Sequence, residues 1–457
     1  MTENEGLEEV GPETERVVLV GLQRDADTLE SAELSLDELE RLVDSCGGEV
    51  IDKKVIRLRD PQPSTLISKG HLEMLKPWVD ASEADIFCID DDFSPVQQRN
   101  LEKYLGCRVL TRTEIILDIF ATHARTRESM TQVELAQLKY RSTRLIGAAI
   151  ASAKMGGASA RIATRGPGEM QLEMDRRHIR ERVQRLERSL QVIRSQRAIQ
   201  RQRRMKSGMP LVGIVGYTNA GKSTLLNRLT QAGVLAENRL FSTLDTTVRS
   251  LAMPGGFEVG LIDTVGFVSK LPHSLVAAFR ATLEEITYAD IILHVADATS
   301  PRLDIECAAT DEILTSLKCE TTPRLTVWNK IDRIDDPVEL RLLPHNRPPA
   351  VAISALENLG IAELLSAVEK MVLEHGHMAT LLIPYDRYDL VARLHRESQV
   401  LDSRDAPEGK LLRCRLAPHL SAVVAEYLYT GAWDDEEEVV DEAYEETQED
   451  LQNPDSR

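Results

Sequence analysis

The sequence of 457 residues is poor in aromatic side chains, lacks long apolar runs and spaces its cysteines widely. Phe, Trp and Tyr make up 4% of the residues and the hydrophobic class 42%, so we expect mostly aliphatic cores. A membrane-spanning helix needs about 18 or more consecutive apolar residues. The sequence offers no such run, so we expect no membrane span.

The six cysteines contain no Cys-x-x-Cys pair, and we expect them to be buried free thiols in a reducing compartment. The first fifteen residues, MTENEGLEEVGPETE, are acidic, whereas signal and transit peptides begin with basic residues. We therefore expect a cytoplasmic protein without membrane attachment. For the oligomeric state our expectation is a monomer, although no motif addresses it.

Charge is strongly segregated along the chain. The net charge is −19, yet the segment from Ala124 to Ser207 holds 20 Lys and Arg against 7 Asp and Glu, an excess of +13. The remaining residues must then carry −32. A solvated helix with mixed charges would show both signs evenly, so the excess favours a surface that binds RNA or another polyanion.

Short apolar runs alternate with helical patterns over residues 16–122, which predicts an N-terminal α/β domain with a mainly parallel sheet. Residues 1–15 are expected to be an acidic, disordered N-terminus. The predicted strands are 17–20, 50–56, 86–89 and 109–111, and the clearest helical patterns are 34–43 and 96–104.

Residues 123–207 read as a basic coiled-coil helical hairpin. Residues 128–145 contain good helix formers, and 147–168 are rich in Gly, Ala and Ser, which predicts a loop. In the second helix Ile179, Val183, Leu186, Leu190 and Ile193 are spaced 4, 3, 4 and 3, which is a heptad seam. The seam predicts an antiparallel pair. The arginines expected to face outward are Arg180, Arg182, Arg185, Arg188 and Arg194.

Strands and helices alternate again over 208–376, which predicts a second α/β domain. A small α+β C-terminal domain with a βαββα-like order is expected over 377–433. The tail 434–457 has 12 acidic residues and one Arg, and is predicted to be disordered.

A phosphate-binding loop lies between an apolar strand and a helix in LVGIVGYTNAGKST. Glycines let the backbone wrap around phosphate oxygens, and the helix N-terminus favours negative charge. Lys222 should reach the β and γ phosphates, and the Ser223 hydroxyl should bind Mg²⁺. The predicted nucleotide-binding residues here are Gly216, Asn219, Ala220, Gly221, Lys222, Ser223 and Thr224.

Downstream of this loop, the strand VGLIDTVGF ends in Asp263-x-x-Gly266. We expect Asp263 to hold Mg²⁺ through water, and the Gly266 amide to sense the γ-phosphate. Lys222 and Gly266 are thus the predicted catalytic groups. Where Ras-like enzymes place a glutamine to orient the attacking water, this chain has Phe267, so the catalytic polar group must come from a backbone, a cation or a partner.

Guanine specificity is predicted by the strand LTVWNKID. Asp332 can accept two hydrogen bonds from N1 and N2 of guanine, a pair that adenine cannot donate. Asn329 can contact the base and brace the phosphate loop, and the stem of Lys330 can cover the base. The backbone of Ser354 and Ala355, at the end of VAISALEN, can meet the guanine oxygen.

A switch threonine is expected in FSTLDTT, where Thr243, Thr246 and Thr247 are candidates. Thr243 lies 20 residues before Asp263, which leaves room for a β-hairpin turning at 254–256, so we favour it as the Mg²⁺ and γ-phosphate ligand. The predicted metal ligands are therefore Ser223, Thr243 and Asp263. Asn219 stands where potassium-activated GTPases carry an ion ligand, which suggests K⁺ as a further cofactor, although it can equally be a brace.

Several segments resemble the HflX family of ribosome-associated GTPases. They are SPVQQRNLE (94–102), RTEIILDIFA (112–121), ARTRESMTQVELAQLKY (124–140), RGPGEMQLEMDRRHIR (165–180), FSTLDTT and DTVGF. The resemblance implies a multidomain α/β fold: an N-terminal parallel α/β domain, an antiparallel helical hairpin, a Ras-like P-loop G domain and a small α+β C-terminal domain.

The resemblance also implies a function. It predicts a GTPase that converts GTP to GDP and phosphate, binds the large ribosomal subunit and splits stalled or idle ribosomes. The hairpin loop 147–168, with Arg161 and Arg165, would contact rRNA. Two alternatives remain open, namely a GTPase of large-subunit assembly and a GTP-gated anti-association clamp with little turnover.

Overall fold

The computed structural model describes residues 14–155, 167–207, 209–230, 241, 248–269, 283–336, 349–375, 377–416, 420 and 423–429. The chain forms two compact units, Met1–His375 and Gly376–Arg457. Residues 1–13 of the predicted acidic N-terminus, the tail 434–457 and the switch threonines lie outside the described residues.

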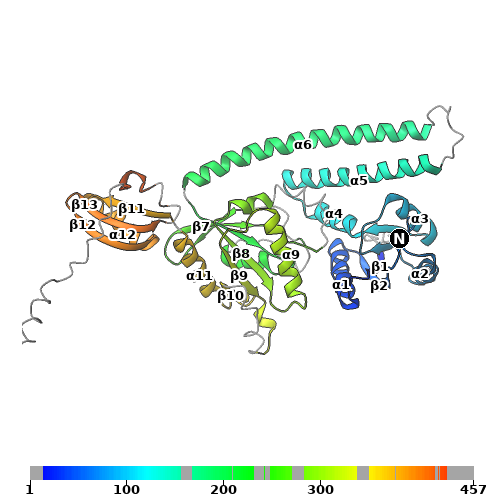
Figure 1. Ribbon diagram of the computed structural model, residues 1–457, viewed down its shortest axis with the longest axis horizontal. Helices are drawn as coiled ribbons and strands as arrows, with labels where there is room; N and C mark the ends of the chain where they lie inside the picture. The colour runs from blue at the N-terminus through cyan, green and yellow to red at the C-terminus, as the bar shows by residue number, and fades with distance from the viewer. Residues whose placement is uncertain are drawn as a thin grey trace, which may run out of the picture. The chain divides into compact units, whose positions relative to one another are not determined.

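The first sheet has four parallel strands in the order β2-β1-β3-β4 (Figure 1). These strands are β1 (Arg16–Gln23), β2 (Glu49–Arg57), β3 (Ile86–Ile89) and β4 (Arg108–Thr111). The helices are α1 (Leu29–Cys46), α2 (Lys69–Ala81), α3 (Pro95–Leu105) and α4 (Arg112–His123). The predicted parallel α/β architecture is confirmed.

Alternating strand residues supply two cores to this sheet. Val17 and Leu19 face α1 and α4, whereas Val18 and Val20 face α2 and α3.

Local signals set where the helices begin. Thr111 caps α4, because its hydroxyl accepts from the Glu114 amide while the Glu114 carboxylate accepts from the Thr111 amide. Arg112 is therefore held at the first position of a helix that starts where β4 ends.

Two long helices follow, α5 (Arg127–Met155) and α6 (Pro167–Ser207), and Figure 1 shows them side by side. Leu186 and Leu190 of the predicted seam are buried against Leu135 of α5, with Val183 and Ile193 beside them. Ion pairs join Glu128 to Arg197 and Lys139 to Glu187. Because the partner's number falls as the number in α5 rises, the two helices are antiparallel.

The prediction of a loop over 147–168 is wrong at both ends. Residues 147–155 belong to α5, and α6 already begins at Pro167. The alanines in AAIASAK are strong helix formers that extend α5, and a proline suits the first turn of a helix, where its missing N–H is not needed.

The second sheet has six strands in the order β10-β9-β8-β5-β7-β6. Only β6, among these strands, runs antiparallel to its neighbour, and it forms with β7 the hairpin that was expected to turn at 254–256. The strands are β5 (Leu211–Val215), β6 (Val248–Ala252), β7 (Glu258–Asp263), β8 (Ile291–Asp297), β9 (Arg324–Asn329) and β10 (Ala350–Ala352). The described helices are α7 (Lys222–Thr230), α9 (Leu303–Ser316) and α11 (Ile361–Glu374).

The C-terminal unit has an antiparallel sheet in the order β11-β13-β12 with one described helix, α12. Its elements are β11 (His377–Ile383), α12 (Tyr388–Glu397), β12 (Gln399–Ala406) and β13 (Gly409–Leu416). The predicted β-α-β-β order is present. After β13, the described residues show a helical Leu420 and a short 3₁₀ turn at Ala425–Tyr427, while residues 417–419, 421 and 422 lie outside the described part of the chain.

The cysteines are free, but the expectation that all six are buried is wrong for two of them. Cys88, Cys307, Cys319 and Cys414 are buried, whereas Cys107 is half-buried and Cys46 is exposed. Among the described residues, no helix is long and apolar enough to cross a membrane.

Candidate nucleotide site

The phosphate loop follows β5 and ends where α7 begins. Gly216 and Gly221 have φ angles of +149° and +95°, which residues with a side chain rarely adopt. A Cβ atom on Gly216 would lie 2.0 Å from the Val295 carbonyl oxygen, and one on Gly221 would lie 2.1 Å from the Asn329 amide nitrogen. A side chain on Gly216 would therefore have to displace the backbone of β8, and one on Gly221 would have to displace the Asn329 side chain.

Lys222 is the first residue of α7, and its side chain is buried. Its ammonium group donates to the Tyr217 carbonyl at 2.7 Å, which holds it inside the loop. Burial lowers the pKa of Lys222 to about 8, while the charge of Asp263 acts in the opposite direction. A bound anion would stabilise the charged form of this amine and raise its pKa again.

Gly266 lies directly beside the phosphate loop. The Thr218 amide donates to the Phe267 carbonyl at 2.7 Å, and the Phe267 amide donates to the Gly216 carbonyl at 3.1 Å. A Cβ atom on Gly266 would lie 3.0 Å from the Lys222 amine. The structure therefore brings the two predicted catalytic groups together. Phe267 is only 1% exposed, as expected for a residue that orients no water.

Asn329 connects the phosphate loop with the predicted guanine loop. Its amide donates to the Ala220 carbonyl at 2.8 Å, and its side-chain oxygen accepts from the Ala355 amide at 3.0 Å. The predicted brace on the phosphate loop is thus present. Because the Ala355 amide is used by Asn329, contact with a guanine oxygen would need a shared hydrogen bond. Ser354 is fully buried, and its hydroxyl accepts from the Glu357 amide.

Lys330 has a φ of +67°, and its amine pairs with Asp297 at 2.7 Å. Lys330 and Asn219 line one cavity of about 200 Å³, together with Thr218 of the phosphate loop. Asp332 follows in a 3₁₀ turn and is exposed. The structure therefore brings the phosphate motif and the guanine motif to one edge of the sheet.

The described residues offer two of the three predicted Mg²⁺ ligands. Ser223 is half-buried in the first turn of α7, and Asp263 ends β7 beside β5, where Ile214 is its register partner. A hydroxyl and a carboxylate at one sheet edge are the hard oxygen donors that suit Mg²⁺. Thr224, the next residue of α7, is also half-buried. The third predicted ligand, Thr243, lies outside the described residues.

Three family profiles match consecutive parts of the chain. Residues 33–121 match "GTP-binding GTPase N-terminal", and 123–204 match "GTP-binding GTPase Middle Region". Residues 211–330 match "50S ribosome-binding GTPase". A GTPase HflX from Caldanaerobacter subterraneus subsp. tengcongensis is 44% identical and covers 83% of this chain and 86% of its own. This chain belongs to the GTPase HflX family.

Other HflX relatives agree. GTPase HflX of Lacrimispora saccharolytica is 42% identical and covers 93% of this chain and 98% of its own, and that of Escherichia coli is 41% identical and covers 79% and 84%. The chain is therefore a GTPase that binds GTP and GDP.

Among solved structures, a Sulfolobus solfataricus GTP-binding protein in complex with GDP covers 78% of this chain and 98% of its own, with 23% identity and a TM-score of 0.41.

Sequence reasoning missed a set of buried charged side chains behind the HflX nucleotide site. Glu38 of α1 and Arg112 of α4 meet Tyr217 of the phosphate loop and Ser269. The available signal was weak. Glu38 falls on the buried face of α1 together with Ser35, Leu39 and Leu42, where an acidic residue is unexpected.

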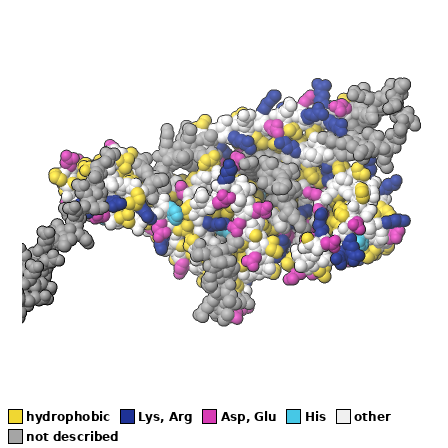
Figure 2. Space-filling model, in the orientation of Figure 1, with side chains coloured by type: hydrophobic (Ala, Val, Ile, Leu, Met, Phe, Trp, Pro, Cys, Tyr) yellow, Lys and Arg dark blue, Asp and Glu magenta, His cyan; other side chains and the backbone are white. Residues whose placement is uncertain are grey.

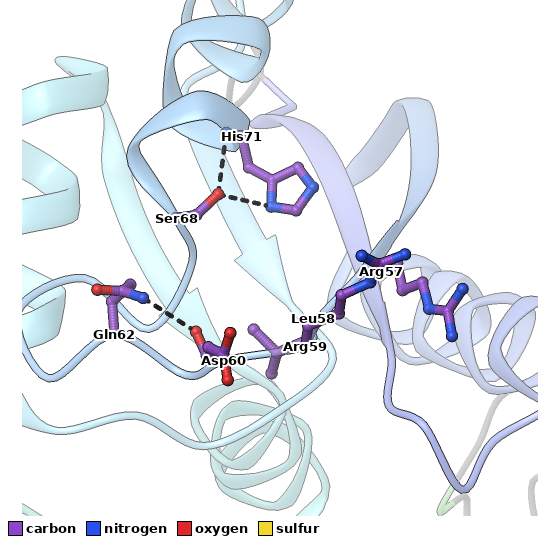
Figure 3. Close-up of a pocket in the computed structure, with 7 residues that line it drawn as sticks. All are labelled: Arg57, Leu58, Arg59, Asp60, Gln62, Ser68 and His71. Atoms are coloured by element: carbon purple, nitrogen blue, oxygen red, sulfur yellow. Dashed lines mark hydrogen bonds between the residues drawn. The ribbon is translucent and has the colours of Figure 1, made fainter.

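A second cavity, of about 380 Å³, lies in the N-terminal α/β part between the end of β2 and the start of α2 (Figure 3). Arg57, Arg59, Ser68 and His71 are among its lining residues. However, the Ser68 hydroxyl accepts from the His71 amide at the start of α2, and Arg57 pairs with Asp25 at 3.3 Å. Because these groups already have partners, we do not assign a second nucleotide site here.

The helix pair presents the basic surface that charge segregation predicted. The five predicted arginines of α6 are all exposed, and Figure 2 shows Lys and Arg side chains along the upper edge of the view, where α5 and α6 lie. Arg182 pairs with Glu134. Among the described residues, Arg180, Arg185, Arg188 and Arg194 have no acidic partner, which leaves their charges available to a polyanion.

Proposed function

We propose that this GTPase binds the large ribosomal subunit and splits stalled or idle ribosomes, and that hydrolysis afterwards releases it. The observation that carries the proposal is the set of exposed arginines on α6 that have no acidic partner in the described part of the chain, in a protein whose GTPase profile is described as ribosome-binding. Arginines that neutralise phosphates provide sequence-independent affinity for RNA.

The nucleotide would control this binding. We propose that Lys222 and the loop amides hold the β and γ phosphates, that Gly266 senses the γ-phosphate, and that Ser223, Thr243 and Asp263 hold Mg²⁺. When bound, Mg²⁺ neutralises charge that develops on the phosphate oxygens. Asn329, Lys330, Asp332, Ser354 and Ala355 would select guanine. With GTP, the G domain would be fixed against the large subunit, and the small subunit could not rejoin.

The connection between α5 and α6 would make the contact with rRNA. It covers residues 156–166 and includes Arg161 and Arg165, together with glycines that allow close approach of the backbone to RNA. The seam of Leu186 and Leu190 makes the helix pair a stiff support for this connection. The segment proposed to contact rRNA is therefore 156–166, which is shorter than the 147–168 expected from the sequence.

Sucrose-gradient sedimentation of ribosomes tests this function. GTP and a non-hydrolysable analogue should both support splitting, and GDP should not. A chain lacking residues 156–166 should bind GTP normally but split no ribosomes, whereas Lys69→Ala, at an exposed lysine outside the helix pair, should split normally. Splitting by the deletion variant would show that the helix pair is only a spacer. Stable subunit binding without splitting would favour assembly or anti-association.

Potassium is the second proposed cofactor. Asn219 has a φ of +61° and lines the cavity beside Lys330, so its amide oxygen is a candidate K⁺ ligand. We expect faster hydrolysis in K⁺ than in Na⁺ at equal ionic strength, and loss of this difference in Asn219→Ala. GTP affinity, measured in both salts, separates a catalytic effect from a binding effect. Equal wild-type rates in the two salts would leave Asn219 as a brace of the loop.

We also propose the domain boundaries expected from the sequence, at 16–122, 123–207, 208–376 and 377–433. The positions of the three sheets and the helix pair support these boundaries, and limited proteolysis would test them. A monomeric state and a cytoplasmic location remain proposals of the same kind.

A further inference from the structure

We propose that Glu38 and Arg112, which lie outside the G domain, are positioning residues for GTP hydrolysis. Together they hold the phosphate loop at Tyr217 and the segment after Gly266 at Ser269. Neither residue belongs to a nucleotide motif. The N-terminal α/β part would thereby set the geometry in which Gly266 and Lys222 face the γ-phosphate.

Glu38 is the centre of this contact, and its side chain is 4% exposed. One carboxylate oxygen accepts from the Tyr217 hydroxyl at 2.5 Å and lies 3.1 Å from the Arg112 guanidinium. The other accepts from the Ser269 hydroxyl at 2.6 Å and from Arg302 at 2.8 Å. Both oxygens are therefore engaged, and three of the four donors come from the G domain.

Arg112 anchors the contact in the N-terminal sheet. Its guanidinium binds Asp90, just after β3, at 2.7 Å, and Ser35 of α1 donates to the same carboxylate at 2.6 Å. The guanidinium also donates to the carbonyl oxygen and hydroxyl of Ser269, at 3.2 and 3.3 Å. A rigid sheet edge is thus joined through one side chain to the backbone that follows Gly266.

Apolar packing reinforces this link. Val265 and Val268, on either side of Gly266 and Phe267, are buried in the same core as α1 and α4. Phe241 belongs to this core too, with its ring centre 4.7 Å from that of Phe120 in α4. Gly266 therefore lies between two side chains that are embedded in the N-terminal α/β core, and it cannot move far without disturbing that core.

The G-domain side of the contact leads directly to the phosphates. The Tyr217 hydroxyl accepts from the Ser269 amide at 2.5 Å, and the Tyr217 carbonyl holds the Lys222 amine. A displacement of Glu38 would thus be transmitted to Lys222 through Tyr217 alone. It would be transmitted to Gly266 through Ser269 and the two residues before it in the chain. Reaction geometry is sensitive at this scale, since a displacement of about 1 Å can cost about 100-fold in rate.

The chemistry of the contact favours a role in positioning over a role in stabilising the folded chain. Burial would raise the pKa of Glu38, but Arg112, the bonds from Ser269 and Tyr217, and Arg302 outweigh burial and keep this pKa below its usual value. Glu38 is thus a buried carboxylate. Buried ion pairs contribute little net stability compared with apolar packing, and their best-supported use is to fix one arrangement among several.

Single-turnover hydrolysis and GTP affinity of the full chain test the proposal. Glu38→Gln keeps the shape of the side chain and removes its charge, whereas Tyr217→Phe removes one hydroxyl and leaves the N-terminal part untouched. We expect each to slow hydrolysis about tenfold while the Kd for GTP changes less than about threefold. Arg112→Lys should give a smaller loss than Arg112→Ala. Glu83→Gln, whose carboxylate is 78% exposed in an ion pair with Arg16, should behave like wild type.

The double variant Glu38→Gln/Tyr217→Phe decides whether the two residues act together. If they do, its rate should match that of the slower single variant. Multiplication of the two effects, or a wild-type rate in a folded Tyr217→Phe protein, would overturn the proposal. Thermal unfolding of every variant separates slow chemistry from a loss of folded protein, and Tyr217→Phe decides alone if Glu38→Gln does not fold.

Discussion

Lys222 makes nucleotide binding depend on pH, because burial disfavours the charged form of its amine. Its pKa of about 8 in the free protein must rise when phosphates bind, so binding takes up a proton above pH 8. Affinity for GTP should therefore be constant below pH 8. It should fall by up to about tenfold per pH unit above it.

Isothermal titration in buffers of different ionisation enthalpy measures this proton uptake. The same shift affects stability with a defined sign. Since the unfolded state holds the Lys222 proton up to its ordinary pKa of 10.5, the contribution of this residue to the stability of the nucleotide-free protein should rise between pH 8 and 10.5. A GTP affinity that stays constant from pH 7 to 9.5 would contradict the shift.

Asp332 should determine the choice of base. Asp332→Asn replaces one acceptor of the pair that faces guanine by a donor, so it should weaken GTP and favour xanthosine triphosphate. Each lost bond to the carboxylate is worth about 1.5–3 kcal/mol. Competitive titration with both nucleotides checks this, and Asp335→Asn, at a neighbouring exposed carboxylate, serves as the control. Unchanged GTP binding by Asp332→Asn would remove the assignment of the guanine motif.

At the residue scale, the sequence predicted those groups whose chemistry demands a local pattern. Gly216, Gly221 and Lys222 stand close together because one phosphate loop needs all three. The contact between Glu38 and Ser269 spans 231 residues, and no local pattern reports such a pairing. Arg112 was visible only as part of a family segment, since an arginine at a helix start is ordinarily solvated.

At the scale of elements, strand positions were predicted better than the ends of the hairpin loop. Short apolar runs that combine β-branched and aromatic residues, such as Ile-Phe-Cys-Ile at Ile86–Ile89, favour buried strands, and the structure places a strand there. By contrast, a segment of Gly, Ala and Ser fits either a loop or a helix. Between 147 and 155, alanine propensity and continuation of α5 prevail over the glycine at 147.

The stiffness of the α5–α6 pair should depend on its narrow apolar seam. Leu190→Ala should destabilise the pairing by about 2–3 kcal/mol, because the leucine is buried between the helices and little else fills the space. Hydrogen exchange of α5 and α6 amides should quicken while that of β5 and β8 stays unchanged. Val192→Ala, at a residue 59% exposed on the same helix, is the matched control. Equal exchange in both variants would argue against a seam.

At the scale of the whole molecule, hydrolysis should depend on a partner. Phe267 occupies the place of the water-orienting glutamine and is buried, so the free GTPase should turn over slowly and large ribosomal subunits should stimulate it. With large subunits present, the wild-type chain should hydrolyse GTP without the substitution Phe267→Gln. Phosphate release measured with and without large and small subunits checks this. Fast turnover by the isolated chain would show that the missing polar group is already present.

The buried cysteines give each of the three sheets a chemical reporter in the sheet or in a helix beside it. Cys88 lies in β3 of the first sheet, Cys307 in α9 beside the second sheet and Cys414 in β13 of the third. Burial raises the pKa of the Cys88 and Cys414 thiols, the latter to about 11, and alkylating reagents attack the thiolate. Modification must therefore wait until a sheet opens. Mass spectrometry of alkylated peptides at rising urea concentrations would then give the order in which the sheets come apart, without any introduced label.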